Sequence, residues 1–330
     1  MDATLVLDGN YLLHRSKGVF LTYNKDIDLS VEKNQINLGK KLGIDILSMI
    51  RTFSPNRVIF TRDSRSWRKD IKIENGSYKS NREDDSDFNY DIFFRIADEV
   101  TDLLDNNGIT RSKIEGAEAD DLFYLWSRVF YKRGENCFIL TYDTDALQNL
   151  RYDPVKKNWV AIYTANKRKE RIYVQKGMGD LSIFNHLKIE VEHIDGVSKI
   201  WDKIFEGDNT DTIPSVYSRK SGTRTYRLTG EKLNFLRTQF LARYKDLDIL
   251  KFLTDDLRIE FVRKTIQTLF CTVVDFNTIK KNLLRNISLI YHDISLFPSD
   301  IITEFAKHEF YDSYTHVDYK KLFENTKYLK

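Results

Sequence analysis

Asp8, Asp63 and Asp143 each follow an apolar run of four to six residues. Such a run, set between helical stretches, is typical of a buried parallel strand. Ligands of open α/β sheets bind at the carboxyl ends of the strands. We therefore expect these three aspartates to lie together at one edge of a sheet, although a single aspartate after a strand could equally occupy a turn or cap a helix.

Six further carboxylates occur in short acidic motifs. They are Glu118, Asp120, Asp121, Asp145, Asp208 and Asp211. Side chains three residues apart lie on one helix face, as co-ligands of a cation would, although acidic residues also favour first helical turns and loops. Carboxylates without a neighbouring His or Cys suit hard cations such as Mg²⁺ or Mn²⁺. Nine carboxylates exceed what one ion needs, so we predict two metal positions.

The elements that must position these carboxylates alternate between strands and helices. Strands are predicted at 4–7, 57–62 and 137–142, and helices at 32–53, 90–106 and 119–133. Alternating strands and helices predict an α/β fold with an open, mostly parallel sheet. Residues 158–163 and a basic tip at 167–169 indicate a β-hairpin, and residues 231–330 are predicted to be mainly helical.

The charge of the chain is near neutral as a whole but uneven along its length. The 330 residues include 52 Lys plus Arg and 49 Asp plus Glu, a formal charge of +3. This balance excludes a uniformly basic nucleic-acid coat and an acidic disordered tail. Residues 83–121 are strongly acidic, whereas 62–82, 151–180 and 217–245 are basic. A charge run is often only a solvated face, but this arrangement also fits cations on the acidic cluster and a polyanion along the basic segments.

Cys137 and Cys271 are too few for a disulfide framework and form no Cys-x-x-Cys pair, so we expect both to be small buried side chains. The N-terminus has no basic region followed by an apolar one, and no stretch approaches 18 apolar residues. We therefore expect a cytoplasmic protein, in the host cytoplasm if it is viral, with no membrane partner.

Five motifs, in order over residues 1–216, resemble those of the metal-dependent 5′-nuclease superfamily of flap endonucleases and 5′–3′ exonucleases. They are Asp-Gly-Asn-Tyr-Leu-Leu at 8–13, Asp63 with Trp-Arg-Lys at 67–69 and Tyr-Lys-Ser-Asn-Arg at 78–82, Glu-Ala-Asp-Asp at 118–121, Thr-Tyr-Asp-Thr-Asp at 141–145, and Gly-Asp-Asn-Thr-Asp-Thr-Ile-Pro at 207–214. The spacing and the divergent C-terminal half are most similar to the T-even phage ribonuclease H branch. The resemblance implies a PIN-like catalytic domain over 1–205, with an arch or gateway at about 71–114. It also implies a helical C-terminal domain over 206–330 with a divergent helix–two-turn–helix-like region.

The resemblance also implies roles for individual residues. One metal position would take Asp8, Asp63, Glu118 and Asp120, and the second would take Asp121, Asp143, Asp145, Asp208 and Asp211. Lys79, Arg82 and Arg68 would act as electrophilic helpers at the phosphate, and Tyr78 would stack on a base. Further nucleic-acid contacts are expected from Lys167, Arg168, Arg219, Lys220, Arg224 and Arg227. The paired glycines of the family's duplex-binding hairpin are missing after Pro214, which puts its K⁺ site in doubt.

The activity implied is two-metal hydrolysis of phosphodiesters, from a 5′ end, in DNA and in the RNA of RNA–DNA hybrids. The expected substrates are DNA with a 5′ flap, nick or 5′ end, as in removal of primers and flaps during phage replication. Protein partners of that setting are a single-strand-binding protein or a sliding clamp, and we expect a monomer. Two alternatives stay open: an endoribonuclease of the small PIN type, and a non-catalytic protein that binds replication forks.

Overall fold

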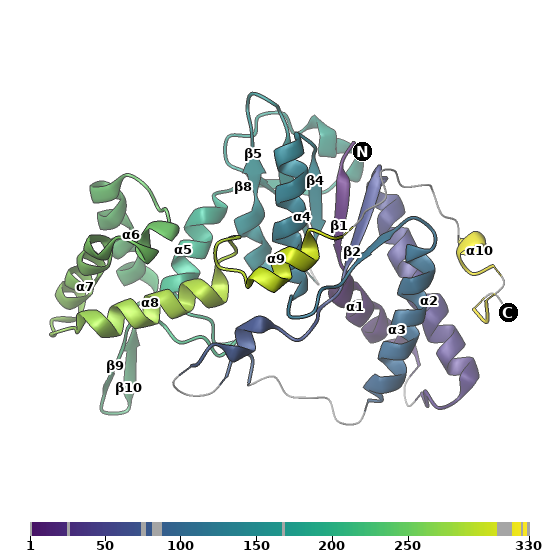
Figure 1. The fold of residues 1–330 in the computed structure, drawn as a ribbon, viewed down its shortest axis with the longest axis horizontal. Coiled ribbons are helices and arrows are strands. Elements are labelled where there is room, and N and C mark those ends of the chain that lie inside the picture. Colours follow the sequence, from purple (N-terminus) through teal and green to yellow (C-terminus); the bar gives the residue numbers. More distant parts are fainter. Residues whose placement is uncertain are drawn as a thin grey trace. The chain divides into compact units, whose positions relative to one another are not determined.

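The computed structural model describes residues 2–24, 27–73, 77–80, 88–166, 169–308, 319–324 and 326–328. The chain forms two compact units that are interleaved in sequence (Figure 1). The first unit comprises Met1–Ser66, Asp84–Ile194 and Phe297–Lys330, and the second comprises Trp67–Glu83 and Asp195–Leu296. No helix among the described residues is long and apolar enough to cross a membrane.

The first unit is built on a sheet with the strand order β3-β2-β1-β4-β6-β7-β8, in which β5 pairs with β6. The strands are β1 (Thr4–Asp8), β2 (Arg57–Thr61), β3 (Thr110–Ser112), β4 (Cys137–Leu140), β5 (Arg151–Tyr152), β6 (Trp159–Asn166), β7 (Lys169–Gln175) and β8 (Glu190–Ile194). The pairs from β3 to β6 are parallel, whereas β7 and β5 run antiparallel to β6. The chain moves outward from β1 through β2 to β3 and then returns to place β4 on the other side of β1. Strand order therefore reverses between β1 and β4, the place where open α/β sheets bind ligands.

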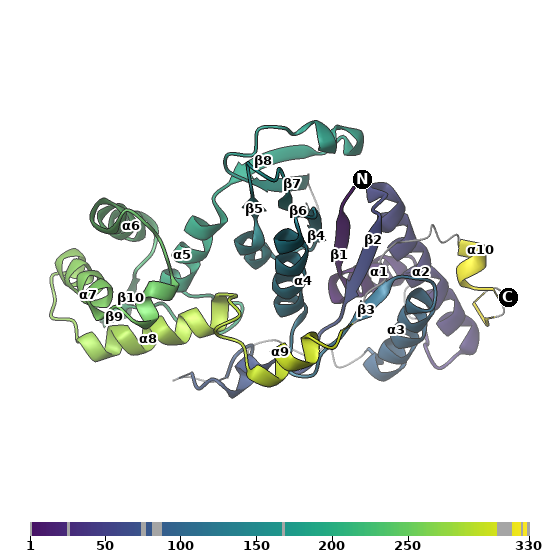
Figure 2. The same ribbon diagram turned by 45° about the horizontal axis from the view of Figure 1, so that its top comes forward.

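Helices α1 (Gly9–Tyr23), α2 (Glu32–Phe53) and α3 (Tyr90–Asp105) lie on one side of this sheet, and α4 (Ala119–Arg133) lies on the other (Figure 2). In α2 the side chains of Leu38, Leu42, Ile46 and Ile50 recur every four residues and are all buried in one cluster with the sheet. The helix ends at Ser54, which adopts a left-handed conformation with φ of 43°. The three helices predicted from apolar spacing are thus confirmed within one residue.

The chain returns to the first unit after residue 296 and packs on two of its helices. Helix α9 (Ser299–Phe305) lies against α4, where the Phe305 ring centroid is 4.8 Å from that of Trp126. The last segment, with α10 (Tyr319–Leu322), lies against α2. Phe323 and Tyr328 there occupy the space left by two helical glycines, Gly43 and Gly39.

The second unit is mainly helical. Its elements are α5 (Gly196–Glu206), α6 (Gly230–Tyr244), α7 (Asp256–Phe270), α8 (Phe276–Ile290) and a two-stranded hairpin of β9 (Ser218–Ser221) and β10 (Arg224–Arg227). Short 3₁₀ helices complete the chain: η1 (Trp67–Asp70) and η4 (Leu250–Leu253) here, and η2 (Thr144–Asn149) and η3 (Ser182–Leu187) in the first unit. The core gathers apolar residues of α5 to α8 around Trp201 and Phe240.

The gateway expected at 71–114 stays a prediction, and its residues 74–76 and 81–87 lie outside the described residues. The range also includes α3, which buries Phe93, Ile96 and Val100, and β3, which pairs with β2. Cys137 is buried as expected, but Cys271 is exposed because it ends α7 in a left-handed conformation. The division into domains at residue 205 stays a prediction.

Candidate functional site

Asp8 lies at the carboxyl end of β1, at the point where strand order reverses. Its Oδ1 accepts a hydrogen bond of 2.9 Å from the Tyr11 backbone N–H, so Asp8 also caps the N-terminus of α1. Its Oδ2 accepts a bond of 2.7 Å from the Thr141 hydroxyl, which follows β4. The side chain is therefore fixed between the two central strands.

Asp63 follows β2 and is held by groups from two helices. Its Oδ1 accepts a 2.6 Å bond from the backbone N–H of Ala119, the first residue of α4. Its Oδ2 accepts a 2.5 Å bond from the side-chain amide of Asn10 in α1. Asp63 thus connects the carboxyl end of β2 with the start of α4, where the Glu-Ala-Asp-Asp motif begins.

The carboxylates of that motif have different environments. Glu118 precedes α4 and is buried, and its Oε2 accepts a 2.8 Å bond from the Ser66 hydroxyl. Asp121 is fully buried, and its Oδ2 accepts a bond of 3.1 Å from the Glu118 backbone N–H. Asp121 therefore caps α4, a role that does not test its predicted metal ligation. Asp120 is half-buried beside them.

Asp143 and Asp145 occupy the turn after β4. Asp143 is exposed, and its Oδ1 accepts a 2.8 Å bond from the Asp145 backbone N–H at the start of η2. The Asp143 backbone N–H in turn donates to the Thr141 hydroxyl, at 3.1 Å. Thr141 thereby links Asp8 and Asp143, the two carboxylates that flank the reversal of strand order.

The electrostatics of Asp8 show that these carboxylates act on one another. Burial, and to a smaller extent the nearby charges of Asp63 and Asp143, raise the pKa of Asp8 to about 7 against the effect of its two hydrogen bonds. Among the described residues, no three His, Cys, Asp or Glu side chains already stand close enough to hold one ion. The repulsion and the oxygen-only donors nevertheless fit divalent cations, because a cation would remove the cost of ionising Asp8.

Asp208 and Asp211 belong to the second unit, in the loop after α5. Burial acts to raise the pKa of Asp208, but an ion pair with Lys203 at 2.6 Å and a bond from Thr210 N–H hold it below its usual range. The loop needs Gly207, since φ there is 82° and a Cβ would lie 2.5 Å from the Ile213 carbonyl oxygen. Their predicted metal ligation stays a prediction.

The expected roles of Tyr78 and Arg68 stay predictions, and both side chains are buried. Tyr78 is 5% exposed and packs in the apolar core of the second unit. Arg68 is 1% exposed. Lys79 is partly exposed, with its Nζ 4.8 Å from the Tyr78 ring centroid, and its backbone N–H donates to the Asp211 carbonyl at 3.0 Å.

Four predicted nucleic-acid contacts come together on the β9–β10 hairpin, where every residue is exposed. Arg219 and Arg224 share one face and Lys220 and Arg227 the other, because side chains alternate along a strand. Arg227 also donates from Nη1 to the Asn209 side chain at 3.0 Å. The other three expected contacts, Arg82, Lys167 and Arg168, lie outside the described residues.

Sequence reasoning missed the neutral residues that orient the carboxylates. Asn10, Ser66 and Thr141 donate to Asp63, Glu118 and Asp8 respectively. Their side chains are common in turns, so nothing in the one-dimensional pattern separates them from ordinary loop residues. The position of Asn10 and Thr141 within two residues of a predicted ligand is the one signal that could have drawn attention to them.

The comparisons with known proteins agree with this architecture. Residues 3–179 match the family model described as "5′-3′ exonuclease, N-terminal resolvase-like domain". A 5′-3′ exonuclease of Mycoplasmopsis pulmonis is 25% identical over 214 residues, which make up 64% of this chain and 61% of that relative. The T5 D15 protein co-crystallised with metal ions has a similar fold, with a TM-score of 0.58, 18% identity and coverage of 92% of this chain and 97% of that one.

A second solved structure, the bacteriophage T5 D15 flap endonuclease in a pseudo-enzyme–product complex with DNA and metal ions, gives a TM-score of 0.55 at 18% identity, over 92% of this chain and 97% of that one. At this identity the likeness concerns the fold. Together with the family match over more than half of the chain, it confirms the superfamily that the motifs predicted. The chain belongs to the 5′-3′ exonuclease family.

Proposed function

We propose that this protein is a divalent-metal-dependent 5′–3′ exonuclease and flap endonuclease, acting on DNA and on the RNA strand of RNA–DNA hybrids. The observation that supports it best is the carboxylate cluster at the reversal of strand order, where burial and repulsion raise the pKa of Asp8 to about 7. Such a site gains stability from cations. The metal ions and DNA bound to the T5 relatives support the same assignment.

Each residue of the cluster has a definite task in this proposal. Asp8, Asp63, Glu118 and Asp120 would hold one cation, and Asp143 and Asp145 a second, joined by Asp121, Asp208 and Asp211. Two such ions, Mg²⁺ or Mn²⁺, would supply hydroxide at neutral pH and offset charge on the leaving oxygen. The chain itself orients the carboxylates: Thr141 and the α1 N-terminus fix Asp8, whereas Asn10 and the α4 N-terminus fix Asp63.

The exposed hairpin supports a duplex-binding role for Arg219, Lys220, Arg224 and Arg227. Four cations on two short strands can contact phosphates on both sides of the hairpin without reading bases. Lys79 would contribute a further positive charge next to the Gly-Asp loop. Removal of RNA primers and 5′ flaps during replication is the biological role that these activities would serve.

The decisive experiment compares three 5′-labelled substrates: a flap, a nicked duplex and an RNA–DNA hybrid, each with Mg²⁺ and with EDTA. We expect cleavage from the 5′ end of all three with Mg²⁺, and none with EDTA. Asp63→Asn should abolish turnover, and Asp91→Asn, which removes the same charge from an exposed position on α3, should not. Cleavage that persists in EDTA, or an active Asp63→Asn variant, would refute the proposal.

A further inference from the structure

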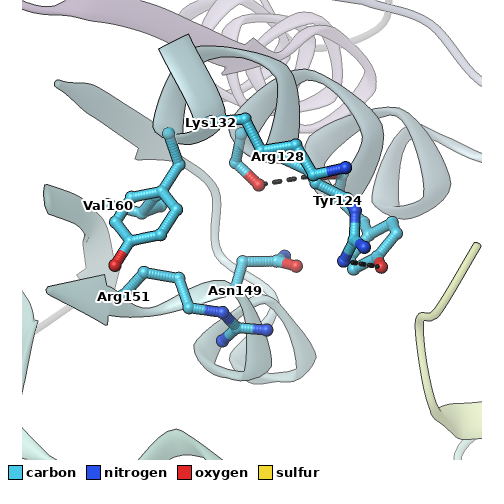
Figure 3. A pocket seen from close by; sticks show the side chains of 8 residues that line it. Tyr124, Arg128, Lys132, Asn149, Arg151 and Val160 are labelled. Carbon is cyan, nitrogen blue, oxygen red and sulfur yellow. Dashed lines mark hydrogen bonds between the residues drawn. The ribbon is translucent and has the colours of Figure 1, made fainter. Parts of the chain in front are cut away.

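A cavity lies in the first unit, on the side of the sheet that carries α4. This cavity, the α4–η2 pocket, has a volume of about 200 Å³ and is lined by α4, the end of η2, β5 and the start of β6. Figure 3 shows the side-chain amide of Asn149 pointing into the space between the guanidinium groups of Arg128 and Arg151. Nothing in the nuclease mechanism uses these side chains.

Asn149 is the least expected residue of the α4–η2 pocket. It is 2% exposed, and within the described part of the chain neither its amide nitrogen nor its amide oxygen has a hydrogen-bond partner. A buried polar group without a partner costs about 1–3 kcal/mol, so native proteins seldom keep one. Here a donor and an acceptor stand side by side, and a ligand with the complementary pair would satisfy both.

Three cationic side chains also line the pocket, together with Tyr124, Ser127, Tyr131 and Val160. Arg128 and Lys132 are four residues apart on α4 and so share a helix face, and Arg151 lies across the cavity on β5. The guanidinium groups are held in place, because Arg128 Nη1 donates to the Tyr124 hydroxyl at 2.8 Å and Arg151 Nη1 donates to the carbonyl of Leu150 at 2.7 Å. No carboxylate stands among the described residues that line the pocket. An anionic group is therefore the expected neighbour of these side chains.

The α4–η2 pocket is separate from the carboxylate cluster. Arg128 lies eight residues beyond Asp120 on α4, which is about 12 Å along the helix at 1.5 Å per residue. Val160, which also lines the pocket, pairs with Cys137 at the start of β4, whereas Asp143 follows the end of that strand. The pocket and the cluster therefore lie toward opposite ends of the strands.

We propose that the α4–η2 pocket binds a nucleoside monophosphate without any metal. The edge of a nucleobase presents a donor and an acceptor together, which is the pattern an Asn amide pairs with. Phosphate suits the cations, of which Lys132 is exposed and can meet a group at the mouth of the cavity. The size is adequate for a planar ring, since an engineered cavity of about 150 Å³ holds benzene. This assignment does not depend on the nuclease activity.

The test is calorimetric titration of the full-length protein in EDTA at low salt, with AMP, adenosine and inorganic phosphate as separate probes. We expect AMP to bind with a dissociation constant below 1 mM, and at least tenfold more tightly than either adenosine or phosphate. Asn149→Leu, which keeps the volume but not the amide, should weaken AMP binding about tenfold. Lys132→Ala should weaken it about fivefold, and Arg133→Ala, one residue further on α4 and outside the lining, should leave it within twofold.

Lys132 is exposed, so its variant tests the proposal even if Asn149→Leu does not fold. A 5′-phosphorylated oligonucleotide, titrated in parallel, separates a free nucleotide from the end of a strand as the natural source. Tighter binding of the oligonucleotide that is equally sensitive to Lys132→Ala would identify the strand end as that source. No binding of AMP, equal binding of AMP and inorganic phosphate, or equal losses in Lys132→Ala and Arg133→Ala would each overturn the proposal.

Discussion

Replacing Asp8 with asparagine should stabilise the metal-free protein, and by an amount that depends on pH. The pKa of Asp8 is raised to about 7 from the 3.8 of an ordinary aspartate, mainly by burial. Between these two pKa values the folded protein holds a proton that the unfolded chain releases. The contribution of Asp8 to the free energy of unfolding is therefore fully present below pH 4 and is lost as the pH rises toward 7. At 1.36 kcal/mol per pH unit, the loss reaches about 4 kcal/mol at pH 8.

The Asp8→Asn variant does not lose this stability as the pH rises, because its amide stays neutral at every pH. The amide oxygen can still accept from the Tyr11 N–H, and the Thr141 hydroxyl can rotate to accept from the amide nitrogen. Asparagine is also as good a helix N-cap as aspartate. We therefore expect the stability difference between the variant and the wild type to grow by about 2.5 kcal/mol between pH 5 and pH 8.

Urea denaturation in EDTA at these two pH values measures the difference directly. A difference that is the same at both pH values would show that Asp8 is not ionised against a penalty, and the electrostatic reasoning would be wrong. Adding Mg²⁺ at pH 8 should stabilise the wild type and narrow the gap, because the ion offsets the charge that the variant lacks. An unchanged gap would count against the metal site but not against the raised pKa.

Three further predictions concern the site, the hairpin and the C-terminal segment. Asp120→Asn should reduce turnover at least 100-fold, as measured by single-turnover cleavage. Its affinity for a flap substrate, measured by fluorescence anisotropy, should be equal or higher. A cleavage rate like that of the wild type would show that the site is misplaced. The double variant Arg224→Ala with Arg227→Ala should flatten the slope of log K against log salt by about 1.8 for duplex DNA. It should also weaken the binding of substrates with a downstream duplex more than the binding of single strands. Equal losses of affinity for both would mean that the hairpin is only a basic surface. Gly39→Ala places a Cβ about 2.1 Å from the Tyr328 ring and should make the C-terminal segment more sensitive to proteolysis. The control Gly18→Ala, whose Cβ meets none of the described atoms within 4 Å, should stabilise α1 by about 1 kcal/mol. Equal resistance of the C-terminal segment to proteolysis in both variants would contradict this.

The central sheet and its helices could be predicted because their signal is local. The apolar spacing of α2 and the continuous apolar runs of β1 and β4 need no knowledge of distant residues. The Asp residues at the ends of those strands could be placed together for the same reason, since parallel strands bring their carboxyl ends to one edge.

The features that could not be predicted from the sequence are those that long-range packing decides. Tyr78 stands in a basic, polar stretch, and only the folded second unit shows that its ring is buried with α5 and α6 residues. The return of residues 297–330 to the first unit depends on the fit of Tyr328 over Gly39, which no periodicity reveals. The sequence showed the basic residues of the hairpin as a cluster. Because the paired glycines of the family's hairpin are missing, it did not predict that these residues lie on two strands.

Arg62 is a buried cation beside the carboxylate cluster, and a neutral side chain mediates its contact with Asp63. Arg62 is 4% exposed, and its guanidinium pairs with Asp98 on α3, at 3.2 Å. It reaches the cluster through a neutral residue, because its Nε donates to the Asn10 oxygen at 3.2 Å while the Asn10 amide donates to Asp63. The arginine thus fixes the orientation of Asp63 through Asn10, and its own ion pair is with Asp98. The Asn10 amide thus lies between the guanidinium and the Asp63 oxygen that it orients, while the charge of Asp63 still acts to raise the pKa of Arg62 against the effect of burial.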